Sequence, residues 1–296
     1  MWIPITLAAA TFQIMRTSRQ HELRAQLSPA AAGFVRFLYG APFALALGAV
    51  WFSLLPHDLP DVPSRFWVHA ALAGVAQILA TNALLRAFRE RNFAIGTVYS
   101  KSEVIAVAIA GAIGLGEPLA VPGWFGAVLV TLGVAWLASK GSITSLLRRA
   151  GDRAALMGLV AGLGFALAAV FIRAASRSMG DAAAFDRALV TLMAMLTIQT
   201  VVNTAGFAVA DRHELPHAFG AWRPAVWVGL FSVLGSMGWA WAITLENAAK
   251  VRTLGQVELI MAFAVAHVQH GDRHARHEYT ASALVLAGVV VVTVLG

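Results

Sequence analysis

Cysteine is absent from the 296-residue sequence, and charged residues are scarce. Without cysteine the chain has no disulfide bond, thiol nucleophile or thiolate metal site. Charged residues make up 12% of the chain, against about 25% in an ordinary soluble domain. Because 59% of the residues are hydrophobic and the mean hydropathy is +0.72, the composition indicates a membrane protein.

Catalytic sequence patterns are also missing. The chain contains no H-E-x-x-H, no G-x-S-x-G and no glycine-rich phosphate loop, so we expect neither an enzyme nor a bound cofactor. The net charge of +7 would suggest a nucleic-acid partner in a soluble chain. Here the basic residues lie between apolar runs, as they do in the cytoplasmic loops of membrane proteins, and we expect no nucleic acid.

Long apolar runs fill most of the chain, and a membrane-spanning helix needs about 20 mainly apolar residues. The N-terminal run lacks the basic region of a secretory signal peptide, so we interpret it as a first span. The sequence predicts an all-α integral membrane protein with ten transmembrane helices. The predicted spans are residues 2–16, 30–55, 66–86, 92–115, 120–139, 154–176, 182–210, 222–245, 249–269 and 279–296.

The two halves of the chain resemble each other. With a shift of 155 residues, Asn92 aligns with Asn247 and Glu103 with Glu258. We therefore predict a first five-helix repeat at 1–139, a connecting loop at 140–153 and a second repeat at 154–296. Because each repeat has an odd number of spans, the second inserts upside down relative to the first. Inverted repeats of this kind are typical of secondary transporters, whose binding sites lie near the midplane where the repeats meet.

Two related segments, "GLGEPLAVPGWFGAVLVTLGVAWLA" at 114–138 and "HGDRHARHEYTASALVLAGVVVVTVLG" at 270–296, follow a common plan. In each, a glycine and an acidic residue precede a turn and a glycine-containing closing helix. This pattern resembles the ten-helix EamA-like permease branch of the drug/metabolite transporter superfamily. The resemblance implies export or exchange of small metabolites, often amino acids or related compounds, through a central cavity.

Glu103 and Glu258 are the strongest candidates for a functional site, because ionisable residues inside a span are costly and usually functional. They could bind a proton or a cationic substrate group; the alternative is a structural carboxylate that fixes helix packing. Lys101 and Gln256 also align across the repeat. Lys101 could reach Glu258 or a substrate carboxylate, or it could lie buried without charge or extend to the interface.

Other polar residues are weaker candidates for substrate binding. Arg36 and Arg187, near the starts of spans two and seven, could hold an anionic substrate bidentately, although anchoring at the membrane interface is the favoured alternative. Gln77, Asn82 and Trp239 could line a cavity, or serve helix packing and the aromatic belt.

Four histidines, His267, His270, His274 and His277, crowd one stretch of the sequence. Their spacing resembles that of metal ligands on a helix. Gly271 and the predicted loop oppose a continuous helix there, so we favour a solvated basic loop over a metal site or a pH sensor.

The sequence therefore predicts a secondary transporter that alternates access between its two halves, with proton coupling among the possible mechanisms. A passive facilitator or lipid-headgroup flippase is the alternative within transport. A membrane enzyme lacks a nucleophile or metal site, and a structural subunit does not explain the repeat. We expect a monomer or homodimer in the plasma membrane (the inner membrane of a bacterium), with a small-molecule substrate, the lipid bilayer and protons as partners.

The orientation follows from the lysines and arginines at the span ends. The loops after spans one, three, five, seven and nine hold most of them: Arg16, Arg19, Arg24, Arg86, Arg89, Arg91, Lys140, Arg148, Arg149, Arg153, Arg212, Arg223, Arg273 and Arg276. The alternate loops hold only Arg65, Arg173, Arg177, Lys250 and Arg252. The positive-inside rule then places both termini outside the cytoplasm. A reporter that is active only in the cytoplasm, fused after Gly296, should be silent; a bright signal would reverse the assignment.

Overall fold

A computed structural model of the chain describes residues 1–23, 26–89, 93–138, 144, 148, 150–261 and 276–296. Within those residues all regular secondary structure is helical, which confirms the all-α prediction. The helices are α1 (Trp2–Leu23), α2 (Pro29–Leu38), α3 (Gly40–Ser53), α4 (Ser64–Arg89), α5 (Phe93–Ser100), α6 (Glu103–Leu115), α7 (Val121–Ala138), α9 (Arg153–Ser178), α10 (Ala184–Ala210), α11 (Glu214–Gly220), α12 (Trp222–Leu245), α13 (Ala248–Leu254) and α15 (Arg276–Leu295).

Seven helical segments in the described part of the chain are long and apolar enough to cross a bilayer. They are Ala30–Ser53, Ser64–Ala87, Val98–Leu115, Arg153–Ser178, Ala184–Ala210, Trp222–Leu245 and His277–Leu295, and a shorter apolar helix covers Val121–Leu137. Each falls in a region where the sequence predicts a span. The protein is an integral membrane protein, and the full set of ten spans remains a prediction.

Two features of the helices differ from the sequence-based expectation. Helix α1 continues to Leu23, past the predicted end of the first span at residue 16. Polar residues extend it, since Arg19 and Glu22 form an exposed ion pair (Nη1–Oε2 3.1 Å) three residues apart, a spacing that favours helix. The second feature is α11, which forms within a predicted connection. Pro216 lies in its first turn, where a missing backbone N–H is tolerated.

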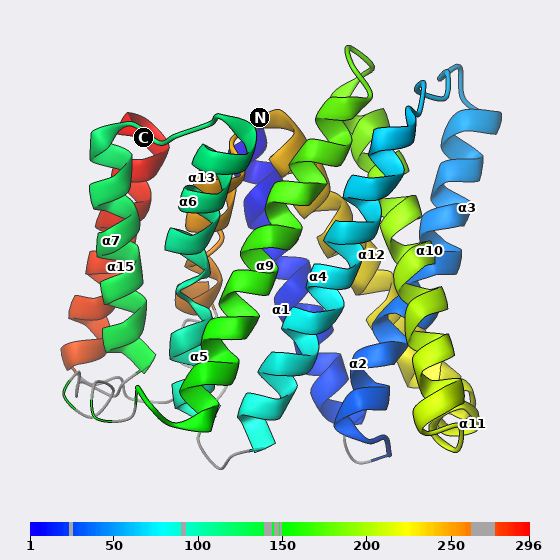
Figure 1. The fold of residues 1–296 in the computed structure, drawn as a ribbon, viewed down its shortest axis with the longest axis horizontal. Coiled ribbons are helices and arrows are strands. Elements are labelled where there is room, and N and C mark those ends of the chain that lie inside the picture. Colours follow the sequence, from blue (N-terminus) through cyan, green and yellow to red (C-terminus); the bar gives the residue numbers. More distant parts are fainter. Residues whose placement is uncertain (24–25, 90–92, 139–143, 145–147, 149, 262–275) are drawn as a thin grey trace. The chain divides into compact units, whose positions relative to one another are not determined.

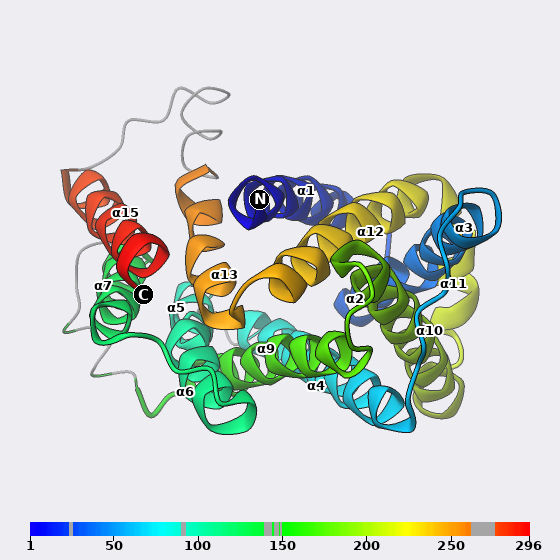
Figure 2. The same ribbon diagram turned by 90° about the horizontal axis from the view of Figure 1, so that it is seen from above.

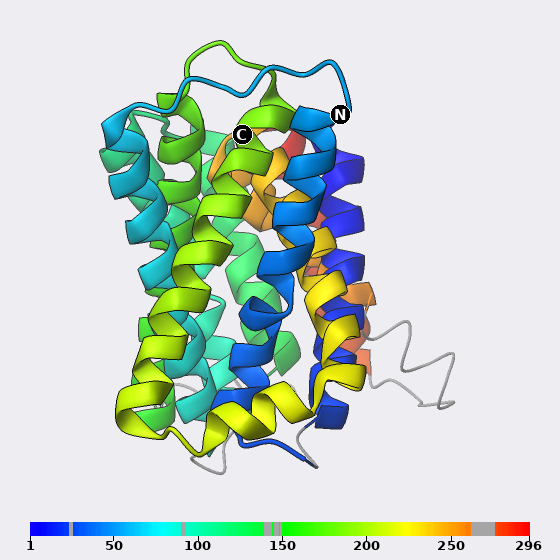
Figure 3. The same ribbon diagram turned by 90° about the vertical axis from the view of Figure 1, so that its right-hand side faces the viewer.

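The predicted second span is interrupted in the middle. Helix α2 begins at Pro29, capped by the Ser28 hydroxyl, which accepts a hydrogen bond from the Ala31 N–H (3.1 Å). The chain then turns at Tyr39, and α3 begins at Gly40 (Figure 3). Pro42 explains the interruption, because proline has no N–H for a continuing helix and is accommodated in the first turn of a new one.

The chain divides into two compact units, which we describe separately. The first comprises Met1–Val75 and Phe171–Leu245. In this unit α1 lies against α12 (Figure 1). The two backbones approach closely at Gly238, where an added Cβ would come within 2.8 Å of Ala9 Cβ. Close approach through small residues is the common way in which helices associate in lipid.

The second unit comprises Ala76–Val170 and Glu246–Gly296. Here α7 and α15, the closing helices of the two repeats, pack side by side (Figure 2). Gly126 and Gly288 meet at the crossing, since a Cβ on either glycine would lie 2.7–2.8 Å from the carbonyl oxygen of the other. Helix α13 lies against α6 in the same unit.

Candidate functional site

Within the second unit, the span that contains Glu103 is distorted directly before that residue. Between α5 and α6, the Lys101 N–H donates to the Val98 carbonyl (3.0 Å) and the Val104 N–H to the Lys101 carbonyl (3.3 Å). Both bonds join residues three apart, as in a 3₁₀ turn, instead of four apart as in an α-helix. A short 3₁₀ segment within a helix often marks a hinge or a strained position.

The repeat-related span has the same distortion. After α13, the Gln256 N–H donates to the Thr253 carbonyl (3.1 Å) and the Leu259 N–H to the Gln256 carbonyl (3.1 Å). These two bonds fall 155 residues after the two bonds at Lys101, which is the spacing of the sequence repeat. The local backbone geometry is therefore repeated together with Glu103 and Glu258.

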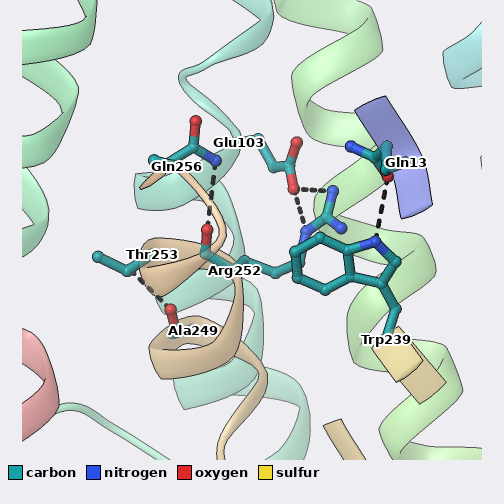
Figure 4. Close-up of polar contacts among 7 residues, drawn as sticks. All are labelled: Gln13, Glu103, Trp239, Ala249, Arg252, Thr253 and Gln256. Atoms are coloured by element: carbon teal, nitrogen blue, oxygen red, sulfur yellow. Dashed lines mark hydrogen bonds and ion pairs between the residues drawn. The ribbon is translucent and has the colours of Figure 1, made fainter. Parts of the chain in front are cut away.

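An ion pair joins the two interrupted spans. The guanidinium of Arg252 on α13 binds Oε1 of Glu103 through both Nε and Nη2 (Figure 4). The side chains are 17% and 5% exposed, respectively. Both charges are thus largely removed from solvent, and each compensates the other.

Hydrogen bonds hold the short helix that contributes Arg252. Asn247 caps α13, since its Oδ1 accepts a hydrogen bond from the Ala249 N–H (2.7 Å). The Asn247 amide also donates to the Glu117 carbonyl (3.0 Å), directly after Gly116, which ends α6 in the left-handed conformation (φ +66°). Asn247 therefore attaches the start of α13 to the end of α6, the helix that begins at Glu103.

We expect Asn247→Ala to lower stability by about 1–2 kcal/mol, because it removes both a helix cap and a contact between two helices. Asn82→Ala on the exposed side of α4 is the matched control and should be neutral or slightly stabilising, since alanine is the better helix former. Thermal unfolding of the two purified variants measures the difference. Equal midpoints would contradict a structural role for the cap.

The ion pair is asymmetric with respect to the repeat. The residue 155 positions before Arg252 is Thr97, so the arginine of the second repeat is not repeated in the first. Glu258 itself is only partly buried, at the start of the segment that follows the turn at Gly255 and Gln256. The two glutamates thus occupy equivalent places in the repeat, but their surroundings differ.

The structure brings several sequence-predicted candidates into this region of the second unit. Lys101 and Gln256 both lie in the tightened turns, Lys101 partly buried and Gln256 4% exposed. The Gln256 amide donates to the Arg252 carbonyl (3.2 Å). Arg252 was missed as a site residue, because by sequence it looks like a loop residue after span eight. Arg252 could have been predicted from Glu103, because a carboxylate inside a membrane span favours a basic residue at the same depth.

The remaining candidates lie elsewhere. In the first unit, Trp239 donates to Gln13 Oε1 (3.1 Å; Figure 4) and Arg187 Nη1 donates to the Gly180 carbonyl (2.9 Å). Both contacts fit the structural alternatives for these residues. Gln77 and Asn82 lie on the part of α4 that belongs to the second unit, one partly buried and the other exposed.

The predicted histidine cluster falls mostly outside the described residues. His267, His270 and His274 are not among them, and His277 is in the first turn of α15. In the part of the chain that the structure describes, no group of three or more histidine or acidic side chains could hold a metal ion.

Repeated, interrupted membrane helices are typical of secondary transporters. The sequence profile of the EamA-like transporter family matches residues 2–139 and 152–294, one match in each half of the chain. The chain therefore belongs to the EamA-like transporter family, within the drug/metabolite transporter superfamily, and has the two-repeat architecture of that family. Members of this family transport small molecules across membranes.

Comparison with other proteins agrees with this fold. A known crystal structure superposes on the chain with a TM-score of 0.71 at 14% sequence identity, and the match covers 99% of this chain and 98% of the other. At this identity the similarity shows the fold alone. No curated protein sequence matches the chain.

Proposed function

We propose that the protein is a secondary transporter that exports or exchanges small metabolites, such as amino acids or related compounds, across the plasma membrane (the inner membrane of a bacterium). The observation that supports this proposal best is the ion pair between Glu103 and Arg252. It joins two repeat-related spans at the place where each is distorted. A charge pair at two hinges is an element whose state a proton or a substrate can change.

The proposed mechanism is a competition for the Glu103 carboxylate. In one state Glu103 binds Arg252. In the other, a proton or a cationic group of the substrate occupies the carboxylate, and Arg252 is released from it. Because a buried charge that loses a counter-charge is destabilised, release of Arg252 from Glu103 favours a rearrangement of α13. The tightened turns at Lys101 and Gln256 are the points at which the two spans bend.

Glu258 has a second role in this proposal. The repeat gives it the same backbone setting as Glu103, with Thr97 in place of an arginine. In this proposal a proton or a cationic group binds Glu258 as well as Glu103, and Glu103 couples its arrival to movement through Arg252.

The main alternative is a passive facilitator or a lipid-headgroup flippase. In either of these the ion pair only holds α6 and α13 together, and flux does not depend on a proton gradient. The two readings differ in one observable, the response of transport to pH in variants without the carboxylates.

The test is uptake into liposomes that contain the purified protein, with and without a pH gradient. A thermal-shift screen against amino acids, nucleosides and cationic drugs first identifies a substrate, since a ligand that binds the folded state raises the unfolding temperature. Glu103→Gln and Glu258→Gln should each reduce the pH dependence of uptake, because glutamine keeps the shape of the side chain but cannot exchange a proton. Glu22→Gln, in an exposed pair on α1, is the control. Wild-type pH dependence in both variants would favour the facilitator.

A further inference from the structure

Arg36 in the first unit is a buried cation without a counter-charge. It lies on α2 with only 7% of its surface exposed, and its Nε has no hydrogen-bond partner. Among the described residues no acidic side chain forms an ion pair with it, and its guanidinium lies over the ring of Phe37 (4.8 Å to the ring centre). A residue that anchors a helix at the membrane interface would extend its charged end to water, so the burial of Arg36 opposes that role.

The positive charge of Arg16 acts on Arg36 and destabilises its charged form. Helices α1 and α2 run in opposite directions, and Gln20 Nε2 donates to the Ala32 carbonyl (2.7 Å). Arg16 precedes Gln20 by four residues on α1, and Arg36 follows Ala32 by four residues on α2. Because the two helices are antiparallel, Arg16 and Arg36 lie at the same level. Their positive charges repel each other there, so the two arginines together produce a positive region inside the unit.

A buried hydroxyl group lies on α12 beside Val233, the residue that faces Gly40, one helical turn beyond Arg36. Ser232 on α12 is 1% exposed, and its Oγ has no hydrogen-bond partner. The register between α12 and α1 is fixed on either side of it: Phe231 stacks with Phe12 (ring centres 6.5 Å apart), and Gly235 lies against Gln13. Ser232 therefore lies at the turn of α1 that leads from Phe12 to Arg16, and it offers an unused O–H donor.

Unused buried donors and an uncompensated buried charge are unfavourable unless a ligand completes them. A planar guanidinium binds a carboxylate through two parallel hydrogen bonds, and a hydroxyl can donate a third. We propose that Arg36, with Arg16 and Ser232, forms a binding site for a carboxylate group of the transported substrate. A single negative charge matches the guanidinium of Arg36, for which no partner is found among the described residues, and this favours a carboxylate over a doubly charged phosphate. This inference rests on the proposed transport function and names one group of the substrate.

Arg187 provides a control within the same unit. It is the repeat counterpart of Arg36 in the sequence alignment, but its Nη1 donates to the Gly180 carbonyl (2.9 Å). An equivalent substitution at Arg187 removes a positive charge from the same unit without removing the proposed ligand contact.

The test is carboxylate binding to the purified full-length protein, measured by calorimetry and thermal shift at constant ionic strength. The probes are alanine and lactate, each compared with its amide, which lacks the negative charge. We expect the acids to bind and the amides not to bind. Arg36→Gln should weaken binding of the acids about tenfold or more, Arg36→Lys should weaken it less, and Arg187→Gln should leave it unchanged.

The stability of the ligand-free protein is a second readout. If Arg36 has a counter-charge only when a ligand is bound, Arg36→Gln removes an uncompensated charge and should raise the unfolding temperature of the ligand-free protein. A lower unfolding temperature, or equal binding by Arg36→Gln and wild type, would overturn the proposal. Saturable binding of chloride or sulfate as tight as that of the acids would also overturn it and indicate an adventitious ion only.

Uptake into liposomes separates this site from the proposed function. Carboxylate binding that depends on Arg36, without uptake of any probe, would support the site and contradict transport. Proton-dependent uptake of a substrate without a carboxylate, unchanged by Arg36→Gln, would support transport and contradict the site.

Discussion

Replacing Glu103 with glutamine is expected to destabilise the protein by about 3 kcal/mol, an effect typical of breaking a buried ion pair from one side. The variant removes the negative charge of Glu103 from the Arg252 guanidinium, which has little access to water. Glutamine keeps a hydrogen-bond acceptor near Arg252 but not its charge. Unfolding of the purified protein by heat or denaturant, followed by helix content, measures the loss.

A double-mutant cycle with Arg252→Gln isolates the interaction. Each single variant should lose stability, and Glu103→Gln combined with Arg252→Gln should lose less than the sum of the two, because two charges that compensate each other are then removed together. Glu22→Gln breaks the exposed pair with Arg19, whose side chains are 55% and 59% exposed, and should change stability by at most about 0.5 kcal/mol. Additive losses at Glu103 and Arg252 would show that the two side chains act independently.

The same cycle bears on the mechanism. If Glu103 and Arg252 only fasten α6 to α13, the double variant should recover stability and transport with the same pH response as the wild type. If they switch partners during transport, the double variant should recover stability but not the pH dependence. Stability and coupling are then separated within a single set of four proteins.

Sequence patterns were sufficient to predict most of the helices, because the physical requirement in lipid is simple. A backbone that leaves water must satisfy its hydrogen bonds internally, and an uninterrupted apolar run can do so only as a helix. The helical segments from Ser64 to Ala87 and from Trp222 to Leu245 therefore agree closely with the predicted spans at 66–86 and 222–245. The length of α1 was harder to predict, because it depends on side-chain pairs such as Arg19 with Glu22 and not on apolar character.

The interruption at Tyr39 could have been found from Pro42, which is the proline that lies deepest in a predicted span. Hydropathy alone does not reveal it, because proline changes the backbone and leaves the apolar run intact. Thr200 on α10 compensates locally, since its hydroxyl donates to the Phe37 carbonyl (3.0 Å) next to the break. Such a compensating contact comes from a distant part of the chain and has no signal in the local sequence.

For the candidate site, the internal repeat predicted Glu103, Lys101 and Gln256 but not Arg252. A repeat reveals what its two copies share, and Arg252 corresponds to Thr97. The partner of a repeated residue can thus be unique to one half.

The second large loss of stability is expected at the contact between α7 and α15, the closing helices of the two repeats. Gly288→Ala on α15 should destabilise the protein by about 2 kcal/mol, within the range for overpacking a close contact. The added methyl carbon would come within 2.7 Å of the Gly126 carbonyl oxygen and 2.8 Å of the Val130 backbone nitrogen. Backbone atoms cannot turn aside as a side chain can, so α7 and α15 must separate along the crossing.

Gly206→Ala on α10 is the matched control, because nothing lies within 4 Å of the methyl group that it adds. It should leave stability unchanged or raise it by about 0.5–1 kcal/mol, since alanine reduces the freedom of the unfolded chain in a helix. Gly126→Ala meets the Gly288 carbonyl at 2.8 Å, so it should behave like Gly288→Ala. The combined variant should lose less than the sum of the two, because helices that have already separated accommodate the second methyl group. Unfolding midpoints of the four proteins decide between these outcomes, and a Gly288→Ala variant as stable as Gly206→Ala would show that α7 and α15 do not approach as closely as this structure has them.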